Sequence, residues 1–155
     1  MNKIEIITGS DDPLPKGKVK KVVKKILSLL GVNRWWLTIS FVDKEQMKAL
    51  NENFKKGASG ATDVLTFCDP VTLKSGLISY NVPGDSIISL SVVKANASEV
   101  GCSKTIELIR VLTHSILHLL GLTHNSYDFS SDPMLVRQEE IVKEITKGGV
   151  KEWDF

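Results

Sequence analysis

The stretch His114-Ser-Ile-Leu-His118-Leu-Leu-Gly121-Leu-Thr-His124 holds all three histidines of the chain. Residues four apart lie one turn apart on the same face of an α-helix, so His114 and His118 can direct their imidazoles at one point. Gly121 favours the left-handed conformation that ends a helix, and the turn would bring His124 over the other two side chains. Three neutral imidazoles that converge predict a transition-metal site with His114, His118 and His124 as ligands.

The expected metal is zinc, Zn²⁺, with one ion per chain. Catalytic zinc sites use three protein ligands and keep the fourth position open for water, whereas structural sites are closed by four ligands. Nickel, copper or another divalent transition metal also suits three imidazoles. The alternative, in which the histidines are merely polar residues on a helix face, does not explain their shared spacing or the glycine at the turn.

Length and composition are those of one soluble globular domain that covers residues 1–155. The apolar runs are too short to span a bilayer, and the first residues carry charge where a signal peptide needs an apolar run. The chain has two cysteines without Cys-x-x-Cys spacing, so we expect free thiols and a cytoplasmic protein with no membrane contact. A net charge of +2 does not by itself indicate a nucleic-acid binder, although clustered positive charge could still serve one.

The hydrophobic pattern predicts an α+β fold in a single domain, with a mixed sheet of about four strands packed against four or five helices. One of these helices is the zincin-like helix that carries the metal ligands. Residues 55–61 are polar and small and predict a loop, and residues 69–84 predict a long connection or a hairpin. Strands are expected at residues 3–8, 35–41, 62–67 and 86–92, and helices at residues 19–30, 43–54, 93–100, 105–120 and 133–145.

The same histidine spacing occurs in metzincin proteases, whose pattern is His-Glu-x-x-His-x-x-Gly-x-x-His. In those enzymes the glutamate after the first histidine is the general base for peptide hydrolysis. Ser115 stands at that position here and has no useful basicity. A metallopeptidase is therefore only a weak alternative, which hydrolysis of a casein-type substrate would revive.

The motif closely resembles the His-Gly-x-Leu-His-Leu-x-Gly-Tyr-Asp-His signature of the YbeY family. Further blocks follow in the order of that family, from about residue 35 to 145, and together they are specific. They are Leu50-Asn51 with Phe54-Lys55-Lys56, Thr62-Asp63-Val64-Leu65-Thr66-Phe67, Gly84-Asp85-Ser86-Ile87-Ile88-Ser89, and Met134 with Gln138-Glu139-Glu140-Ile141.

The resemblance implies a zinc-dependent endoribonuclease, a hydrolase that acts on RNA phosphodiester bonds. Its expected substrate is single-stranded ribosomal RNA, in maturation of the 16S rRNA 3′ end and in ribosome quality control. The expected partners are this RNA and the small ribosomal subunit or its proteins. His114 is expected to be both a ligand and a catalytic residue.

Four departures from the family pattern concern the surroundings of the ligands. Ser115 replaces a glycine and should add a side chain at the edge of the site, and Leu122-Thr123 replaces Tyr-Asp and removes a carboxylate. The proline after the Ser-Phe pair is displaced to Pro70. Lys55 or Lys56 replaces the arginine, in a loop one residue longer, and is the predicted catalytic cation that orients the scissile phosphate. Lysine offers a point charge where arginine forms two parallel hydrogen bonds, so we expect weaker phosphate positioning.

These departures leave a second class of function open, a ribosome-assembly or RNA-binding factor with a mainly structural metal. Arg110, one turn before His114, could share the role of the catalytic lysine, or could form an ordinary ion pair with Glu107.

Two other pairs of residues have structural and functional interpretations. Asp63 and Asp85 could orient a ligand histidine or cap turns where strands begin. Cys68 and Cys102 are expected to be small buried residues rather than ligands.

Overall fold

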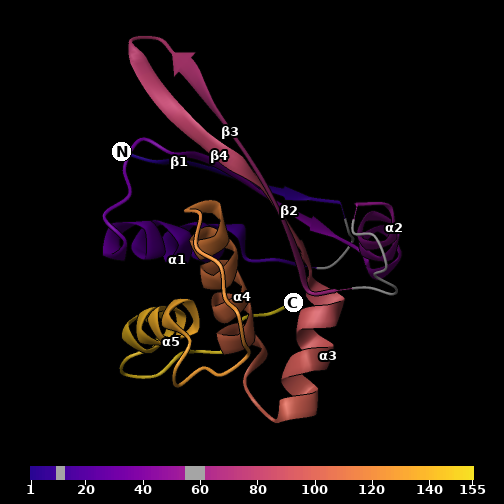
Figure 1. Cartoon of the computed structure of the whole chain (residues 1–155). Coiled ribbons are helices and arrows are strands. Elements are labelled where there is room, and N and C mark those ends of the chain that lie inside the picture. The colour runs from indigo at the N-terminus through magenta and orange to yellow at the C-terminus, as the bar shows by residue number, and fades with distance from the viewer. Residues whose placement is uncertain (10–12, 55–61) are drawn as a thin grey trace.

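The structure, a computed structural model, describes residues 1–9, 13–54 and 62–155 of the chain (Figure 1). Its described part confirms the predicted α+β class, with four strands, five helices and one mixed sheet. In chain order the elements are β1 (Lys3–Thr8), α1 (Lys16–Leu29), β2 (Trp36–Val42), α2 (Lys44–Phe54), β3 (Val64–Ser75), β4 (Ile78–Ser89), α3 (Leu90–Val100), α4 (Lys104–Leu119) and α5 (Pro133–Ile145).

The sheet has the strand order β1-β2-β4-β3. β1 and β4 both run parallel to β2, whereas β3 and β4 form an antiparallel pair. Alternation along β2 buries Leu37, Ile39 and Phe41 completely or nearly so, because successive side chains point to opposite faces. Figure 1 shows α1, α4 and α5 together on one side of this sheet, and their apolar residues join those of β2 in one core cluster.

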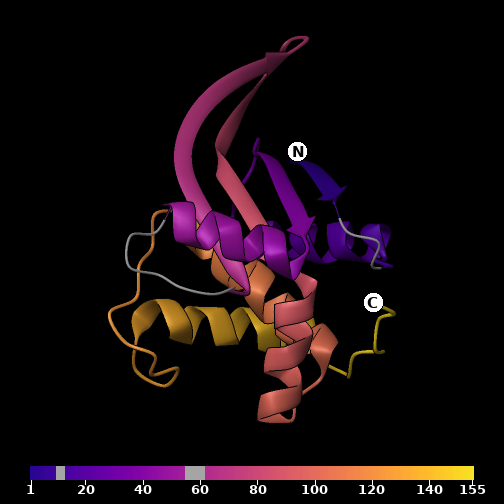
Figure 2. The ribbon, with the colours of Figure 1, turned by 90° about the vertical axis from the view of Figure 1, so that its right-hand side faces the viewer.

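The segment predicted as a long connection or hairpin forms a hairpin. β3 and β4 pair from Val64↔Ile88 out to Ser75↔Ile78, and the ribbon extends well beyond the helices (Figure 2). The predicted strand at 86–92 is wrong at its end, because Ser89 caps α3 by accepting a hydrogen bond from the Val92 amide. A short apolar, β-branched run fits a buried strand and a buried helix equally well, so its boundary could not be predicted from the pattern.

α4 is the helix on which the site depends, and its N-terminus is held by the C-terminal tail. Ser103 is the N-cap, and the Glu152 carboxylate accepts hydrogen bonds from the Ser103 hydroxyl at 2.6 Å and the Thr105 amide at 3.0 Å. These bonds hold the pKa of Glu152 below its ordinary value. The buried side chains of Trp153 and Phe155 pack the tail into the core. No helix in the described part of the chain has both the length and the apolar character needed to cross a membrane.

Candidate metal centre

The end of α4 brings the three histidines together as the motif predicts. Gly121 has φ +93°, and the Leu122 and Gly121 amides donate to the carbonyls of Leu117 and His118 at 3.1 and 2.8 Å. This pair of bonds is the Schellman motif, which ends a helix and reverses the chain direction. It places His124 beside the two histidines that the helix presents one turn apart.

One ligand nitrogen from each of His114, His118 and His124 can be chosen so that all three lie within 4.8 Å of one another. The Nε2 atoms of His114 and His118 are 3.0 Å apart. In a tetrahedral site with metal–nitrogen bonds of about 2.0–2.1 Å, two ligand nitrogens would lie roughly 3.3 Å apart. The cluster therefore has the dimensions of a site that can hold a metal ion.

The Nδ1 atoms of the histidines are engaged away from the common point. Those of His118 and His124 lie 2.9 and 3.0 Å from the backbone carbonyl oxygens of Leu122 and Ser126. A carbonyl oxygen only accepts, so Nδ1 carries the proton and the lone pair of each ring is on Nε2. Outer hydrogen bonds of this kind fix the tautomer of metal-binding histidines, and the donor set here fits a transition metal.

The third Nδ1, that of His114, lies 2.7 Å from Oε1 of Gln138 on α5. Gln138 is only 2% exposed, and its Nε2 donates to the Glu139 carboxylate at 3.0 Å. Because a carboxylate accepts and cannot donate, Glu139 holds the amide with its oxygen toward His114. Burial lowers the pKa of His114, opposed in part by the bond to Gln138, so the neutral imidazole that binds a metal is favoured.

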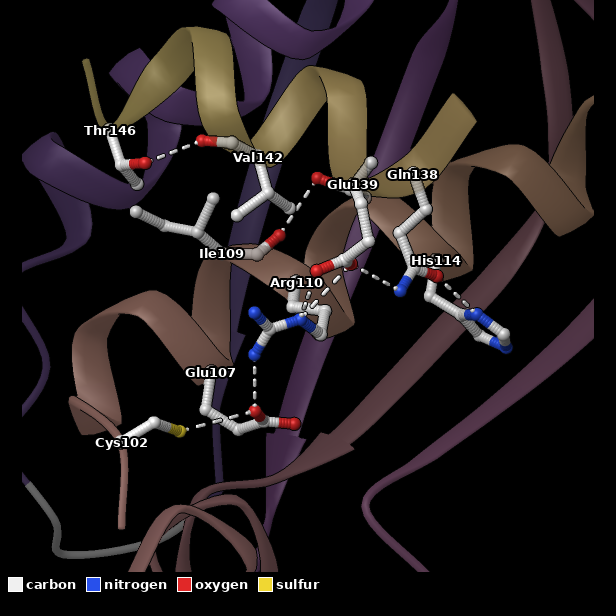
Figure 3. A network of polar contacts seen from close by, with 10 residues as sticks. Cys102, Glu107, Ile109, Arg110, His114, Gln138, Glu139, Val142 and Thr146 are labelled. Carbon is white, nitrogen blue, oxygen red and sulfur yellow. Dashed lines mark hydrogen bonds and ion pairs between the residues drawn. The ribbon is translucent and has the colours of Figure 1, made fainter. Parts of the chain in front are cut away.

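Arg110 completes this network, which Figure 3 shows running from Cys102 to His114. Its Nε donates to both carboxylate oxygens of Glu139 at 3.1 Å, and its Nη1 donates to Glu107 at 2.7 Å. Burial works to lower the pKa of Arg110, but the two carboxylates outweigh it and raise the pKa. The predicted ion pair with Glu107 is thus present, and a second pair that no sequence pattern indicated accompanies it.

We expect Gln138→Leu to weaken zinc binding about 10- to 100-fold, because the His114 ring loses the acceptor that orients it. The affinity is measured by competition with a chromophoric chelator. Gln138→Glu, which keeps an acceptor at this position, should lose less. Equal affinity in the wild type and Gln138→Leu would contradict an orienting role for this amide.

A cavity of about 460 Å³ opens beside the histidines. Its wall mixes polar and apolar side chains, and the polar ones beside the histidines include Asp63, Thr66, Arg110 and Gln138. Asp63 therefore lies at the site, whereas Asp85 is an exposed residue of β4 and is not part of this wall. Lys55 and Lys56, the predicted catalytic cations, lie outside the described residues.

Two sequence-based expectations about neighbouring residues are wrong. Ser115 does not point to the edge of the site; it is 1% exposed and its hydroxyl lies 2.5 Å from that of Ser86 and 3.3 Å from that of Thr66. It faces the sheet, because the two hydroxyls that it contacts belong to β4 and β3, and it is not among the residues that line the cavity. Cys68 is exposed, lines the cavity and donates to the His118 carbonyl, because β3 continues past it into the projecting hairpin. Cys102 is half-buried, and both thiols are free.

Fold and site together define a class of small α+β protein. In this class the end of one helix and the turn after it present three histidines to an open cavity. Three imidazoles with room for a further ligand are the arrangement of metal-dependent hydrolases.

Comparison with known proteins identifies the family. Residues 6–146 match the family model described as endoribonuclease YbeY. The endoribonuclease YbeY of Persephonella marina is 36% identical over 135 residues, which cover 87% of this chain and 86% of the relative. That of a Sulfurihydrogenibium species is 35% identical over 133 residues, which cover 86% and 85%. The chain belongs to the YbeY endoribonuclease family, as the sequence resemblance predicted.

A solved structure supports the fold. The solution structure of a Thermotoga maritima protein superimposes with a TM-score of 0.61 at 26% identity, over 92% of this chain and 88% of that chain. From the sequence, Gln138 is recognisable only as part of a block that matches the family. Its direct contact with a ligand histidine required the packing of α5 on α4.

Proposed function

We propose that this chain is a zinc-dependent endoribonuclease that cleaves single-stranded RNA in the maturation of ribosomal RNA. Endoribonuclease activity is that of the family to which the chain belongs. The observation that carries the metal dependence is the convergence of three histidines on an open cavity. Backbone carbonyls accept from Nδ1 of His118 and of His124 and so orient both rings. His114, His118 and His124 would be the ligands, and His114 would also be the first catalytic residue.

The residues of the chain supply binding and orientation in this mechanism. When bound, a zinc ion would supply an acidified water and neutralise charge on the phosphate oxygens. The outer hydrogen bonds of the histidines keep their Nε2 atoms directed at one point while the substrate enters. Lys55 or Lys56 would contribute a cation to hold the scissile phosphate, and hydrogen bonding from the polar cavity wall would orient it.

The finer features of the proposal follow from the family resemblance. They are one metal-dependent hydrolase domain over residues 1–155, action at the 16S rRNA 3′ end, a role in ribosome quality control, and a place in the cytoplasm at the small ribosomal subunit. The endoribonuclease names of the relatives support an RNA substrate.

Removal of the metal tests the central statement. Treatment with a chelator should abolish cleavage of a labelled single-stranded RNA, and stoichiometric zinc should restore it, because a bound metal would supply an acidified water and charge neutralisation. Nickel and copper are added in parallel, and circular dichroism checks that the metal-free protein stays folded. A duplex of the same sequence should be cleaved much more slowly, and casein should not be cleaved.

The outcomes separate the proposed function from its rivals. RNA binding without any metal-dependent cleavage would favour an assembly factor, which the missing carboxylate at Thr123 and the absent arginine first suggested. Chelator-sensitive hydrolysis of casein would favour a peptidase. Cleavage that persists in fully metal-free protein would overturn the metal dependence.

A further inference from the structure

The segment between α4 and α5 carries two exposed aromatic side chains. Tyr127 is 85% exposed and Phe129 is 49% exposed. Both line the cavity that holds the three histidines. Folding usually removes large apolar side chains from water. Two aromatic rings that stay exposed beside the same cavity therefore indicate a binding surface.

The backbone beneath these rings is firmly built. The Asp128 carboxylate, between the two aromatic residues, accepts from the Ser130 amide at 2.9 Å and from the Ser130 and Ser131 hydroxyls at 2.6 and 2.7 Å. These bonds, led by the Ser130 hydroxyl, lower the pKa of Asp128 to about 2, so the carboxylate is charged and can accept all three bonds near neutral pH.

A second carboxylate holds the two ends of the segment. Asp132 accepts from the Asn125 amide at 3.0 Å and caps α5 through the Met134 amide at 3.2 Å. The rings are therefore presented by an ordered turn, and little conformational entropy remains to be lost when something packs on them.

The aromatic pair is continuous with the proposed metal centre. The Tyr127 ring contacts that of His124 edge-on, with centroids 5.2 Å apart and planes at 63°. A ring this exposed keeps most of its surface for a ligand even with that contact. A flat group placed on Tyr127 would lie beside the three histidines.

We propose that Tyr127 and Phe129 form a stacking subsite for an unpaired nucleobase next to the scissile phosphate. The inference rests on the proposed RNA substrate and explains selection of single strands. Bases in a duplex are already stacked on each other and are shielded from an aromatic side chain, whereas an unpaired base can leave its neighbours and stack on it. The cavity beside the rings combines the three histidines and Arg110 with apolar side chains, a mixture that suits a nucleotide with a flat base and a charged phosphate.

The test uses the zinc-loaded protein and a single-stranded RNA oligonucleotide. Tyr127→Ala should raise KM, or the Kd measured by fluorescence anisotropy, roughly 10- to 100-fold, the usual loss for one base–aromatic stack. Tyr127→Phe and Tyr127→Trp should bind nearly as the wild type does. Phe129→Ala, which removes a ring that does not touch a histidine, should also weaken binding. Zinc content is measured for every variant, so that an effect on His124 is recognised.

The matched control is Leu77→Ala, which removes a fully exposed apolar side chain at the tip of the hairpin and should change nothing. In a second arm, single abasic nucleotides are placed along the RNA. At one position near the cleavage site the abasic RNA should bind the wild type weakly and should lose nothing further with Tyr127→Ala, because both changes remove the same stack.

Unchanged RNA binding by both alanine variants at full zinc content would overturn the subsite, even if the wild type cleaves RNA well. The subsite would also be overturned if the losses in binding free energy caused by the abasic nucleotide and by Tyr127→Ala were additive when the two changes are combined. Impaired binding of a protein, with RNA binding intact, would assign the rings to a protein partner and contradict the proposal. If the wild type cleaves no RNA, the proposed function fails, and the abasic binding arm still decides whether the rings stack a base.

Discussion

His114→Ala is expected to lose tight zinc binding and to reduce cleavage of single-stranded RNA to background. The substitution removes one of the three converging ligands. It also removes the imidazole whose Nδ1 is bonded to the Gln138 side chain. The loss in zinc affinity should exceed the 10- to 100-fold loss typical of an outer hydrogen-bond partner, because a direct ligand disappears. The histidine motif itself offers no carboxylate as a substitute ligand, since Thr123 stands where the family has aspartate.

Zinc content after dialysis and single-turnover cleavage measure the two effects separately. The substitution also leaves Oε1 of Gln138 without its partner, which should cost about 1–3 kcal/mol of stability. Folding of the variant is therefore checked by thermal denaturation. Arg137→Ala, on the neighbouring helix and outside the cavity wall, is the matched control and should keep both zinc and activity. Undiminished cleavage by His114→Ala would refute the catalytic assignment.

Gly84→Ala should be the most damaging single-methyl addition in the sheet. Gly84 has φ +141°, and a Cβ built there would lie 1.9 Å from the carbonyl oxygen of Phe67 on the paired strand. The contact occurs where β4 faces Cys68, immediately before the register shift that bends β3 into the projecting hairpin. Backbone on both sides prevents an easy shift, so we expect a loss on the order of 3 kcal/mol or more in the free energy of unfolding.

Gly76→Ala provides the comparison. Gly76 also has a positive φ, +63°, but a Cβ there meets nothing within 4 Å. It should cost about 1–2 kcal/mol, the penalty of the left-handed conformation alone. Urea unfolding gives the free energy of unfolding of each variant, and the two are compared where the dependence on urea concentration has the same slope. Equal losses in the two variants would show that backbone conformation, and not the close approach to Phe67, determines the effect.

Much of the fold could be predicted because its signals are local. The capping box at the start of α2 is present as expected, with Asp43 accepting from the Gln46 amide and Gln46 accepting from the Asp43 amide. The helix that ends at Gly121 and the alternation along β2 follow equally from neighbouring residues. The full length of the β3–β4 hairpin was not predicted, because Pro70, Gly76, Pro83 and Gly84 are typical of turns and interrupt the apolar alternation of its outer half.

Within the site, the residues predicted to be ligands lie together, and their role as ligands stays a prediction that His114→Ala tests. The sequence by itself determined the three histidines and the turn that gathers them, because helical periodicity and the left-handed preference of glycine act over a few residues.

Only the tertiary structure decided what surrounds them. Gln138 reaches His114 because α5 packs on α4, and Ser115 faces the sheet because α4 lies against β3 and β4. Tyr127 and Phe129 lie at the cavity rim because two carboxylates shape the turn between those helices. Such contacts join residues whose spacing follows no period, and the physical reason is that packing between elements, rather than the chain's local preferences, brings them within hydrogen-bonding distance.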